Sequence, residues 1–138
     1  MIWSLVVNYH LKMLFARLLN YGLREEMQEY SIILTLEAIY DIADIADYIE
    51  KEFGQHRADR FQSDIKNQLQ SLSHSGTIFP KTQLLYRGYF IHKKSFSPSL
   101  IFYIIMEETK EIHILRVLRH ERNWADILSQ KAKYAYPQ

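Results

Sequence analysis

Apolar residues between positions 36 and 75 recur at helical spacing in two separate runs. The first run has apolar side chains three or four residues apart, at Leu36, Ile39, Ala43, Ala46, Ile49 and Phe53. The second run repeats this pattern at Ala58, Phe61, Ile65, Leu69 and Leu72. Each run predicts an amphipathic helix, over 36–53 and 56–75, because these spacings place the apolar side chains on one stripe. Neither stripe is stable alone in water, so we expect a helical hairpin packed on a flat layer.

Residues at the ends of the two runs support these helix boundaries. Thr35 can accept a hydrogen bond from an otherwise free N–H of the first turn, and Gly54 is typical of a helix C-terminus. Gly76 and Pro80 end the second run. Both helices therefore have start or stop signals of their own, besides their apolar stripes.

The layer under the hairpin is predicted from four runs of β-branched and aromatic residues. These runs span 30–34, 84–92, 100–106 and 112–119. The connectors 97–99 and 107–111 are short enough for antiparallel hairpins, and a short helix is predicted from about residue 123. The predicted fold is therefore α+β, in the order β-α-α-β-β-β. A helical hairpin packs on a mostly antiparallel four-stranded sheet, and a short C-terminal helix follows.

The first 26 residues form a separate segment in this pattern. Their apolar positions predict an amphipathic helix, with a stripe at Trp3, Val7, Leu11, Leu14, Leu18 and Tyr21. We divide the chain into an N-terminal extension, 1–26, and a domain, 27–138, for which Met27 offers a second possible start. The extension is either a helix docked on the domain or a segment that the domain can dispense with. Charged residues at Lys12 and Arg17 interrupt it, so a membrane span is not expected. It also lacks a basic start and a small-residue cleavage site, so a signal peptide is not expected either.

The composition excludes several kinds of site. A chain of 138 residues is long enough for one domain with a sizeable core, and its lack of Cys excludes disulfides and thiolate metal sites. The six His residues show no pair spaced as metal ligands on one helix, and the four Gly residues form no phosphate-binding loop. We therefore expect no metal and no cofactor. A chain without Cys also fits a reducing, cytoplasmic location.

Charge is unevenly distributed, although the formal net charge is only +1. Residues 25–52 contain nine Asp and Glu against one Lys, whereas residues 81–122 contain eight Lys and Arg against four Glu. Part of the acidic excess is a row on the first helix that we expect in solvent: Asp41, Asp44 and Asp47. An anion or nucleic acid is expected to bind the basic half, if it binds at all.

Arg116 lies within an otherwise apolar strand. Strict alternation places Arg116 and Leu118 on the same face as Ile112 and Ile114, and both faces are apolar enough for a covered, central strand. Burying an ionised group without a partner costs several kcal/mol. Two explanations are open. In the first, Arg116 has a structural role: it pairs with a carboxylate of the acidic helix or lies at the open edge of the sheet. In the second, Arg116 lines a polar face that binds phosphate.

A cluster of cations follows at the junction of the last strand and the terminal helix: Arg119, His120 and Arg122. By themselves they are the solvated end of a strand. Further cations are expected on the neighbouring strands at Arg87, Lys93 and Lys94. Together with Arg116, these residues form a candidate anion- or nucleic-acid-binding surface. His120 is the member that changes charge near neutral pH, so it could transfer a proton.

Two motifs resemble the RelE/ParE superfamily of bacterial toxins, the plasmid stabilisation protein family. One is the early helix "LTLEAIYDIADIADYIEKEFG", and the other is the last strand with its helix, "IHILRVLRHERNWADIL", preceded by "LIFYII". The resemblance runs from about Glu29 to Leu128. It implies a compact α+β toxin of a type II toxin–antitoxin system, neutralised by a cognate antitoxin. Members of the superfamily inhibit growth by cutting mRNA on the ribosome or by poisoning DNA gyrase.

The nuclease branch of the superfamily implies a particular set of residues. In such enzymes a cation stands at the start of the strand that matches 100–105, where this chain has Ser99 and Leu100. A second cation stands just past the last strand, near His120 and Arg122. An aromatic or acidic residue often follows on the terminal helix, where Trp124 and Asp126 are found.

This chain matches the nuclease set only in part, through Lys93, His120 and Arg122. RNA cleavage needs a base, a proton donor and cations on the phosphate, so His120 and Arg122 are the catalytic candidates if the protein is an enzyme. Because the set is incomplete, we favour gyrase poisoning. A ribosome-dependent mRNA endonuclease and an inactive antitoxin-binding module on the same fold remain the alternatives.

Overall fold

The computed structural model describes residues 29–131 and 133–138, so the helix predicted within 1–26 lies outside the described residues. Along the chain the elements are β1 (Ser31–Leu34), α2 (Leu36–Phe53), α3 (Gln55–Ser75), the 3-10 turn η1 (Gly76–Ile78), β2 (Lys81–Tyr86), β3 (Tyr89–Phe96), β4 (Ser99–Met106), β5 (Glu111–Arg119) and α4 (Trp124–Gln130). The α+β class, the helical hairpin and the short terminal helix are confirmed. No helix in the described ranges is long and apolar enough to cross a membrane.

The sheet has five strands in the order β1-β5-β4-β3-β2, one more than predicted. β1 pairs with β5 in parallel, and the other pairs are antiparallel. The extra strand arises because residues 84–92, predicted as one strand, belong to the hairpin of β2 and β3. Arg87 and Gly88 form its two-residue turn with φ values of 55° and 85°. Such a turn usually carries Asn or Asp before Gly, so Arg87 weakened the signal.

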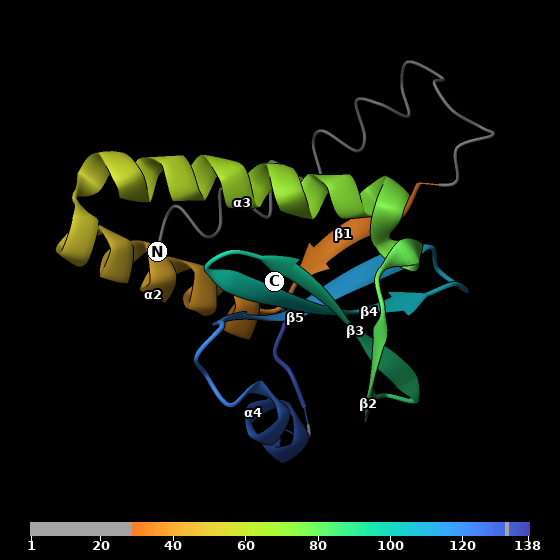
Figure 1. The fold of residues 1–138 in the computed structure, drawn as a ribbon. Coiled ribbons are helices and arrows are strands. Elements are labelled where there is room, and N and C mark those ends of the chain that lie inside the picture. Colours follow the sequence, from red (N-terminus) through yellow and green to blue (C-terminus); the bar gives the residue numbers. More distant parts are fainter. Residues whose placement is uncertain (1–28, 132) are drawn as a thin grey trace.

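Both faces of the sheet are covered (Figure 1). The hairpin of α2 and α3 packs on one face, where Leu34, Ile65, Leu69 and Tyr103 belong to the first buried core. On the other face α4 and the C-terminal residues close a second core. That core contains Phe102, Ile104, Leu115, Leu128 and Tyr134. Two independent cores therefore share one sheet, and β5 is buried on both sides.

A β-bulge in β5 changes which of its residues share a face. Phe102 of β4 pairs with Arg116, but the next residue, Tyr103, pairs with Ile114, so one residue of β5 is extra. The alternation therefore reverses beyond the bulge. Val117 joins Ile112 and Ile114 in the hairpin core, and Leu118 lies in the second core. The prediction that Leu118 shares a face with Ile112 and Ile114 was wrong, because it assumed an unbroken period of two.

Thr35 links the first helix to the sheet, as well as capping the helix. Its hydroxyl is fully buried, accepts a 3.0 Å hydrogen bond from the Ala38 N–H and donates a 2.8 Å hydrogen bond to the Leu115 carbonyl. We expect Thr35→Ala to lower the free energy of unfolding by about 1–2 kcal/mol. Thr35→Ser keeps both hydrogen bonds and is expected to lose much less. Urea denaturation of the two variants checks this, and equal losses would contradict a role for the hydroxyl.

Candidate target-binding surface

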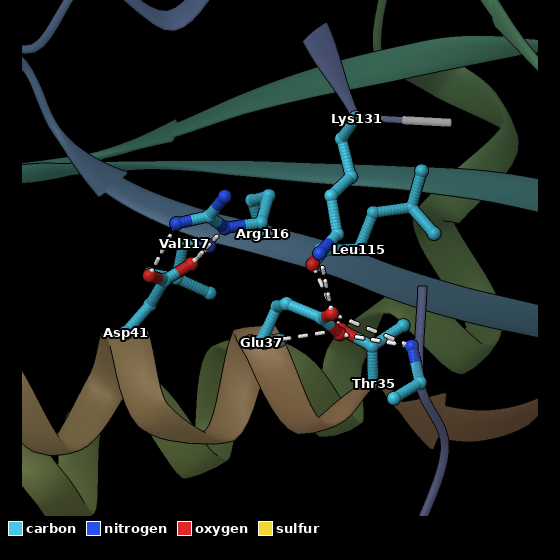
Figure 2. Close-up of polar contacts among 9 residues, drawn as sticks. Thr35, Glu37, Asp41, Leu115, Arg116, Val117 and Lys131 are labelled. Carbon is cyan, nitrogen blue, oxygen red and sulfur yellow. Dashed lines mark hydrogen bonds and ion pairs between the residues drawn. The ribbon is translucent and has the colours of Figure 1, made fainter. Parts of the chain in front are cut away.

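The Arg116 side chain pairs with Asp41 of α2, the first of the two explanations open from the sequence (Figure 2). The Arg116 Nε–H donates to Asp41 Oδ2 at 2.6 Å, and an Nη2 hydrogen donates to Asp41 Oδ1 at 2.9 Å. The two side chains are only 16% and 10% exposed. Burial raises the pKa of Asp41, and the hydrogen bonds from Arg116 oppose that rise. The guanidinium is therefore used within the fold and is not free to bind a phosphate.

The same carboxylate completes the open edge of β5. β1 is short and pairs with β5 only from Glu111 to Ile114, so the later residues of β5 pair with β4 on one side and have no neighbouring strand on the other. There α2 replaces it: the Thr35 hydroxyl binds the Leu115 carbonyl, and Asp41 Oδ2 accepts the Val117 N–H at 3.0 Å. Buried backbone groups must find partners, so these two side chains fix α2 against β5. Asp41, expected in solvent, is buried for this reason, whereas Asp44 and Asp47 are exposed as predicted.

The C-terminal residues are tied to the start of α2 through Glu37. The Ala135 N–H donates to the Glu37 carboxylate at 3.1 Å, Lys131 Nζ lies 3.0 Å from it, and the Leu36 N–H donates to the Ala135 carbonyl at 2.8 Å. Burial favours the neutral acid, but the hydrogen bonds from Lys131 and Ala135 outweigh it and lower the pKa of Glu37. This junction holds the tail over the second core, next to the Arg116–Asp41 pair (Figure 2).

His120 and Arg122 lie exposed in the turn after β5. Their backbone N–H groups donate to the carbonyls of Pro98 and Arg119, both at 3.0 Å. Among the residues that the structure describes, neither side chain makes a hydrogen bond or an ion pair. Arg119 differs, because its guanidinium binds Glu121 and lies 3.8 Å above the ring of Tyr48. At the end of β5, His120 and Arg122 therefore have exposed side chains without hydrogen-bond or ion-pair partners in the described structure, whereas the side chain of Arg119 is held by its contacts.

A groove lies next to this strand end. It is bounded by the C-terminal end of α2, the N-terminal end of α3 and the β3–β4 turn. It has a volume of about 460 Å3, and two carboxylates, Asp64 and Glu121, contribute to its lining. It combines three arginines with four aromatic side chains: Arg57, Arg60, Arg119, Tyr48, Phe53, Phe61 and Phe96. We call these seven residues the arginine groove. Arg57 lies 4.8 Å above the ring of Phe53, and Tyr48 meets Phe53 edge to face at 6.5 Å. In the described part of the chain, Arg57 and Arg60 have no carboxylate partner.

The remaining predicted cations do not gather around one point. Lys93 pairs with Phe102 on the second-core face and lies 4.8 Å above the ring of Trp124. Lys94 pairs with Ile101 on the hairpin face and donates to Gln68 of α3. Arg87 is exposed in the β2–β3 turn. The structure thus brings Arg119, His120 and Arg122 together, and it places Lys93 and Lys94 on opposite faces of the sheet.

The position where the nuclease pattern requires a cation is occupied by a buried hydroxyl. Ser99 is fully buried at the start of β4, and its Oγ has no hydrogen-bond partner in the structure. Near the other nuclease positions, Asp126 accepts a hydrogen bond from Asn123 at 2.8 Å. In the described ranges, no three His, Asp or Glu side chains come close enough together to hold a metal ion. The set of residues that the nuclease pattern implies is therefore incomplete, with Ser99 where the pattern has a cation.

Sequence reasoning missed the arginine groove apart from Arg119. Tyr48 and Phe53 are exposed aromatic residues of α2, and Phe53 had been counted in the apolar stripe. Arg57 and Arg60 are one helical turn apart at the start of α3. These four positions become neighbours only because α2 and α3 fold into a hairpin. The available signal was the pair of arginines three residues apart, directly after a helix end rich in aromatic side chains.

Comparison with known proteins places this arrangement in a family. Residues 32–124 match the family model described as the ParE toxin of the type II toxin–antitoxin system parDE. The chain belongs to this toxin family. It is also similar to a solved structure described as the chromosomal ParDE toxin–antitoxin system from P. aeruginosa, with a TM-score of 0.57 at 23% identity over 68% of this chain and 99% of that chain. No curated protein sequence matches it.

Family membership makes this protein a type II toxin and confirms the resemblance found in its sequence motifs. The matched range contains the helical hairpin, the sheet except for Ser31, and the strand end with His120 and Arg122. It ends at Trp124, the first residue of α4. The residues before position 32 and the C-terminal residues that close the second core are outside the match.

Proposed function

We propose that this toxin arrests growth by acting on DNA gyrase, and that a cognate antitoxin neutralises it. The observation that carries the proposal is the incompleteness of the nuclease set. RNA cleavage requires a base, an acid and cations around one phosphate. Here the buried Ser99 stands where the nuclease pattern has a cation, so one of the cations is missing. A protein target needs no such convergence, and the family match favours the same conclusion.

We propose that the toxin contacts its target through the arginine groove together with His120 and Arg122. Tyr and Arg are among the residue types most often found at the energetic centres of protein interfaces. In the groove, Tyr48 and Phe53 supply apolar contact area, while Arg57 and Arg60 present guanidinium groups without carboxylate partners in the described structure. The three guanidinium groups outnumber the two carboxylates of the lining, Asp64 and Glu121, so the surface suits a protein segment that carries carboxylates, and charge complementarity would also speed its association.

We further propose that the antitoxin binds as a segment that orders on the toxin, covering apolar surface that the described structure leaves exposed. The similar P. aeruginosa structure is described as a ParDE toxin–antitoxin system, which supports a partner of this kind. Because we propose gyrase as the target, we also propose the cytoplasm as the location of the toxin. A purified chain that binds no product of an adjacent gene would contradict this part of the proposal.

Incubation of the purified toxin with gyrase, ATP and supercoiled plasmid is expected to produce double-strand breaks covalently linked to gyrase. The readout is linear DNA that appears only after denaturation with detergent and proteolysis. Reactions without gyrase, and with a type I topoisomerase in its place, are the controls. In expressing cells, mRNA ends are mapped in parallel. Cuts in mRNA within codons, without gyrase-linked DNA breaks, would favour the endonuclease. Continued growth of the expressing cells, with neither mRNA cuts nor DNA breaks, would favour the inactive antitoxin-binding module.

A further inference from the structure

An exposed apolar patch lies where the helical layer stops short of the sheet's free edge. Leu85 of β2 and Phe90 of β3 are register partners and are 57% and 48% exposed. Ile78 of η1, just before β2, is 73% exposed. We call these three residues the outer patch. They account for half of the large exposed apolar side chains in the described structure. Their grouping near one edge therefore indicates a surface that another segment or molecule covers.

The outer patch faces the same side of the sheet as the helical hairpin. Phe90 lies two residues from His92, so both side chains point to one face. The His92 ring stacks on Tyr103 at 5.1 Å, and Tyr103 belongs to the hairpin core. A hollow of about 370 Å3 opens beside Phe90 and Ile105. In Figure 1, α3 ends and passes through η1 into β2, so the two-helix layer leaves this part of the five-stranded sheet bare.

The described chain begins at the same end of the sheet. The Tyr30 N–H donates to the Ser73 carbonyl at the end of α3, and the Tyr30 hydroxyl donates to Glu107, which lines the hollow. Ser31 pairs with Glu111 on β5, and Glu111 pairs with Met106 on β4. Phe90 on β3 is therefore three strand spacings from β1, or about 14 Å.

The sequence before Glu29 has the pattern that such a bare surface requires. Its apolar stripe, from Trp3 to Tyr21, repeats at helical spacing. A helix of that length would extend about 30 Å, enough to lie along the sheet. The polar linker 24–28 could bridge about 17 Å when extended, which exceeds the three strand spacings. Length, point of entry and pattern all suit a third helix in the layer.

We infer that the segment before Glu29 lays its apolar stripe on the outer patch and completes the helical layer over β2 and β3. This cover would shield an edge strand that otherwise exposes backbone groups and apolar side chains together, a combination that promotes self-association. The role that we assign to the segment is to cover the patch. The inference does not depend on the toxin's target.

The test uses Trp3, because the chain contains only one other tryptophan, Trp124. In full-length Trp124→Phe, all tryptophan emission comes from Trp3. It is expected to be blue-shifted and poorly quenched by acrylamide. Adding Leu85→Ser and Phe90→Ser should shift the emission to the red and increase quenching, since the stripe loses its binding surface. Tyr40→Ser is the matched control, because Tyr40 is an aromatic residue of α2 that is 51% exposed outside the patch.

Each outcome decides the inference, provided that thermal melts show every variant folded. A red shift with Leu85→Ser and Phe90→Ser but not with Tyr40→Ser supports it, as does faster tryptic cleavage at Lys12 and Arg17 in the patch variant alone. Emission from Trp3 that is already red in the parent chain, or that ignores the patch substitutions, overturns it. An equal shift with Tyr40→Ser also overturns it, because the stripe would then rest on the hairpin.

Discussion

Replacing Asp41 by alanine is expected to lower the free energy of unfolding by about 3–5 kcal/mol. The substitution removes the acceptor of three hydrogen bonds, two from Arg116 and one from the Val117 N–H. It leaves a guanidinium that is only 16% exposed without its carboxylate. It also leaves the Val117 N–H without an acceptor, at the edge of β5 that α2 covers and β1 does not reach. Urea denaturation measures the loss, and loss of toxicity in this variant would follow from unfolding.

Two variants separate the ion pair from the backbone contact. Arg116→Ala is expected to destabilise the fold less than Asp41→Ala, because the Val117 N–H keeps its acceptor. The double variant should lose less than the sum of the two single losses, since both remove one shared interaction. Asp44→Ala is the matched control: it is an exposed acid of the same helix, with an expected change within about 0.5 kcal/mol. A loss for Asp41→Ala as small as that of Asp44→Ala would contradict the structural role of the pair.

The helices were predictable because their determinants are local. The stripe from Leu36 to Ile49 and the cap at Thr35 lie within a few turns of one another, and α2 and α3 have nearly the predicted bounds. The β2–β3 hairpin was not predicted, because its turn depends on one residue besides Gly88, and Arg87 is an unusual choice there. The bulge in β5 was also invisible. It depends on how β4 pairs with β5, and no local pattern around Leu115 records that pairing.

The candidate surface was predictable at the strand end and nowhere else. Arg119, His120 and Arg122 are close in sequence, so their grouping needs no knowledge of the fold. Lys93 and Lys94 are adjacent on a strand, so the sequence implies that they lie on opposite faces of the sheet. Only the structure shows that Lys94 contacts α3 on one face and Lys93 contacts α4 on the other. The pairing of Arg116 with a carboxylate of the acidic helix was one of two open explanations. Choosing between them required the position of α2 across the open edge of β5.

Replacing His120 and Arg122 together by alanine is expected to abolish growth arrest while antitoxin binding persists. These two side chains are exposed and unengaged in the described structure, so His120→Ala and Arg122→Ala remove little packing and the fold should keep its stability. Arg119→Ala is less informative, because it also removes the contacts with Glu121 and Tyr48. The measurements are colony formation after induced expression, a thermal melt of each purified variant, and co-purification with the antitoxin.

The matched control is Lys133→Ala, which removes one exposed positive charge from the C-terminal tail. It should leave growth arrest unchanged, because the proposed contact depends on the position of the charge and not on the net charge. The pair of single variants adds a test of mechanism. If His120 transfers a proton, His120→Ala alone should abolish toxicity, and Arg122→Ala should weaken it. If both act as contacts with a protein target, each single variant should weaken toxicity and the double variant should remove it. A folded double variant that arrests growth like the parent chain would show that the toxin acts through another surface.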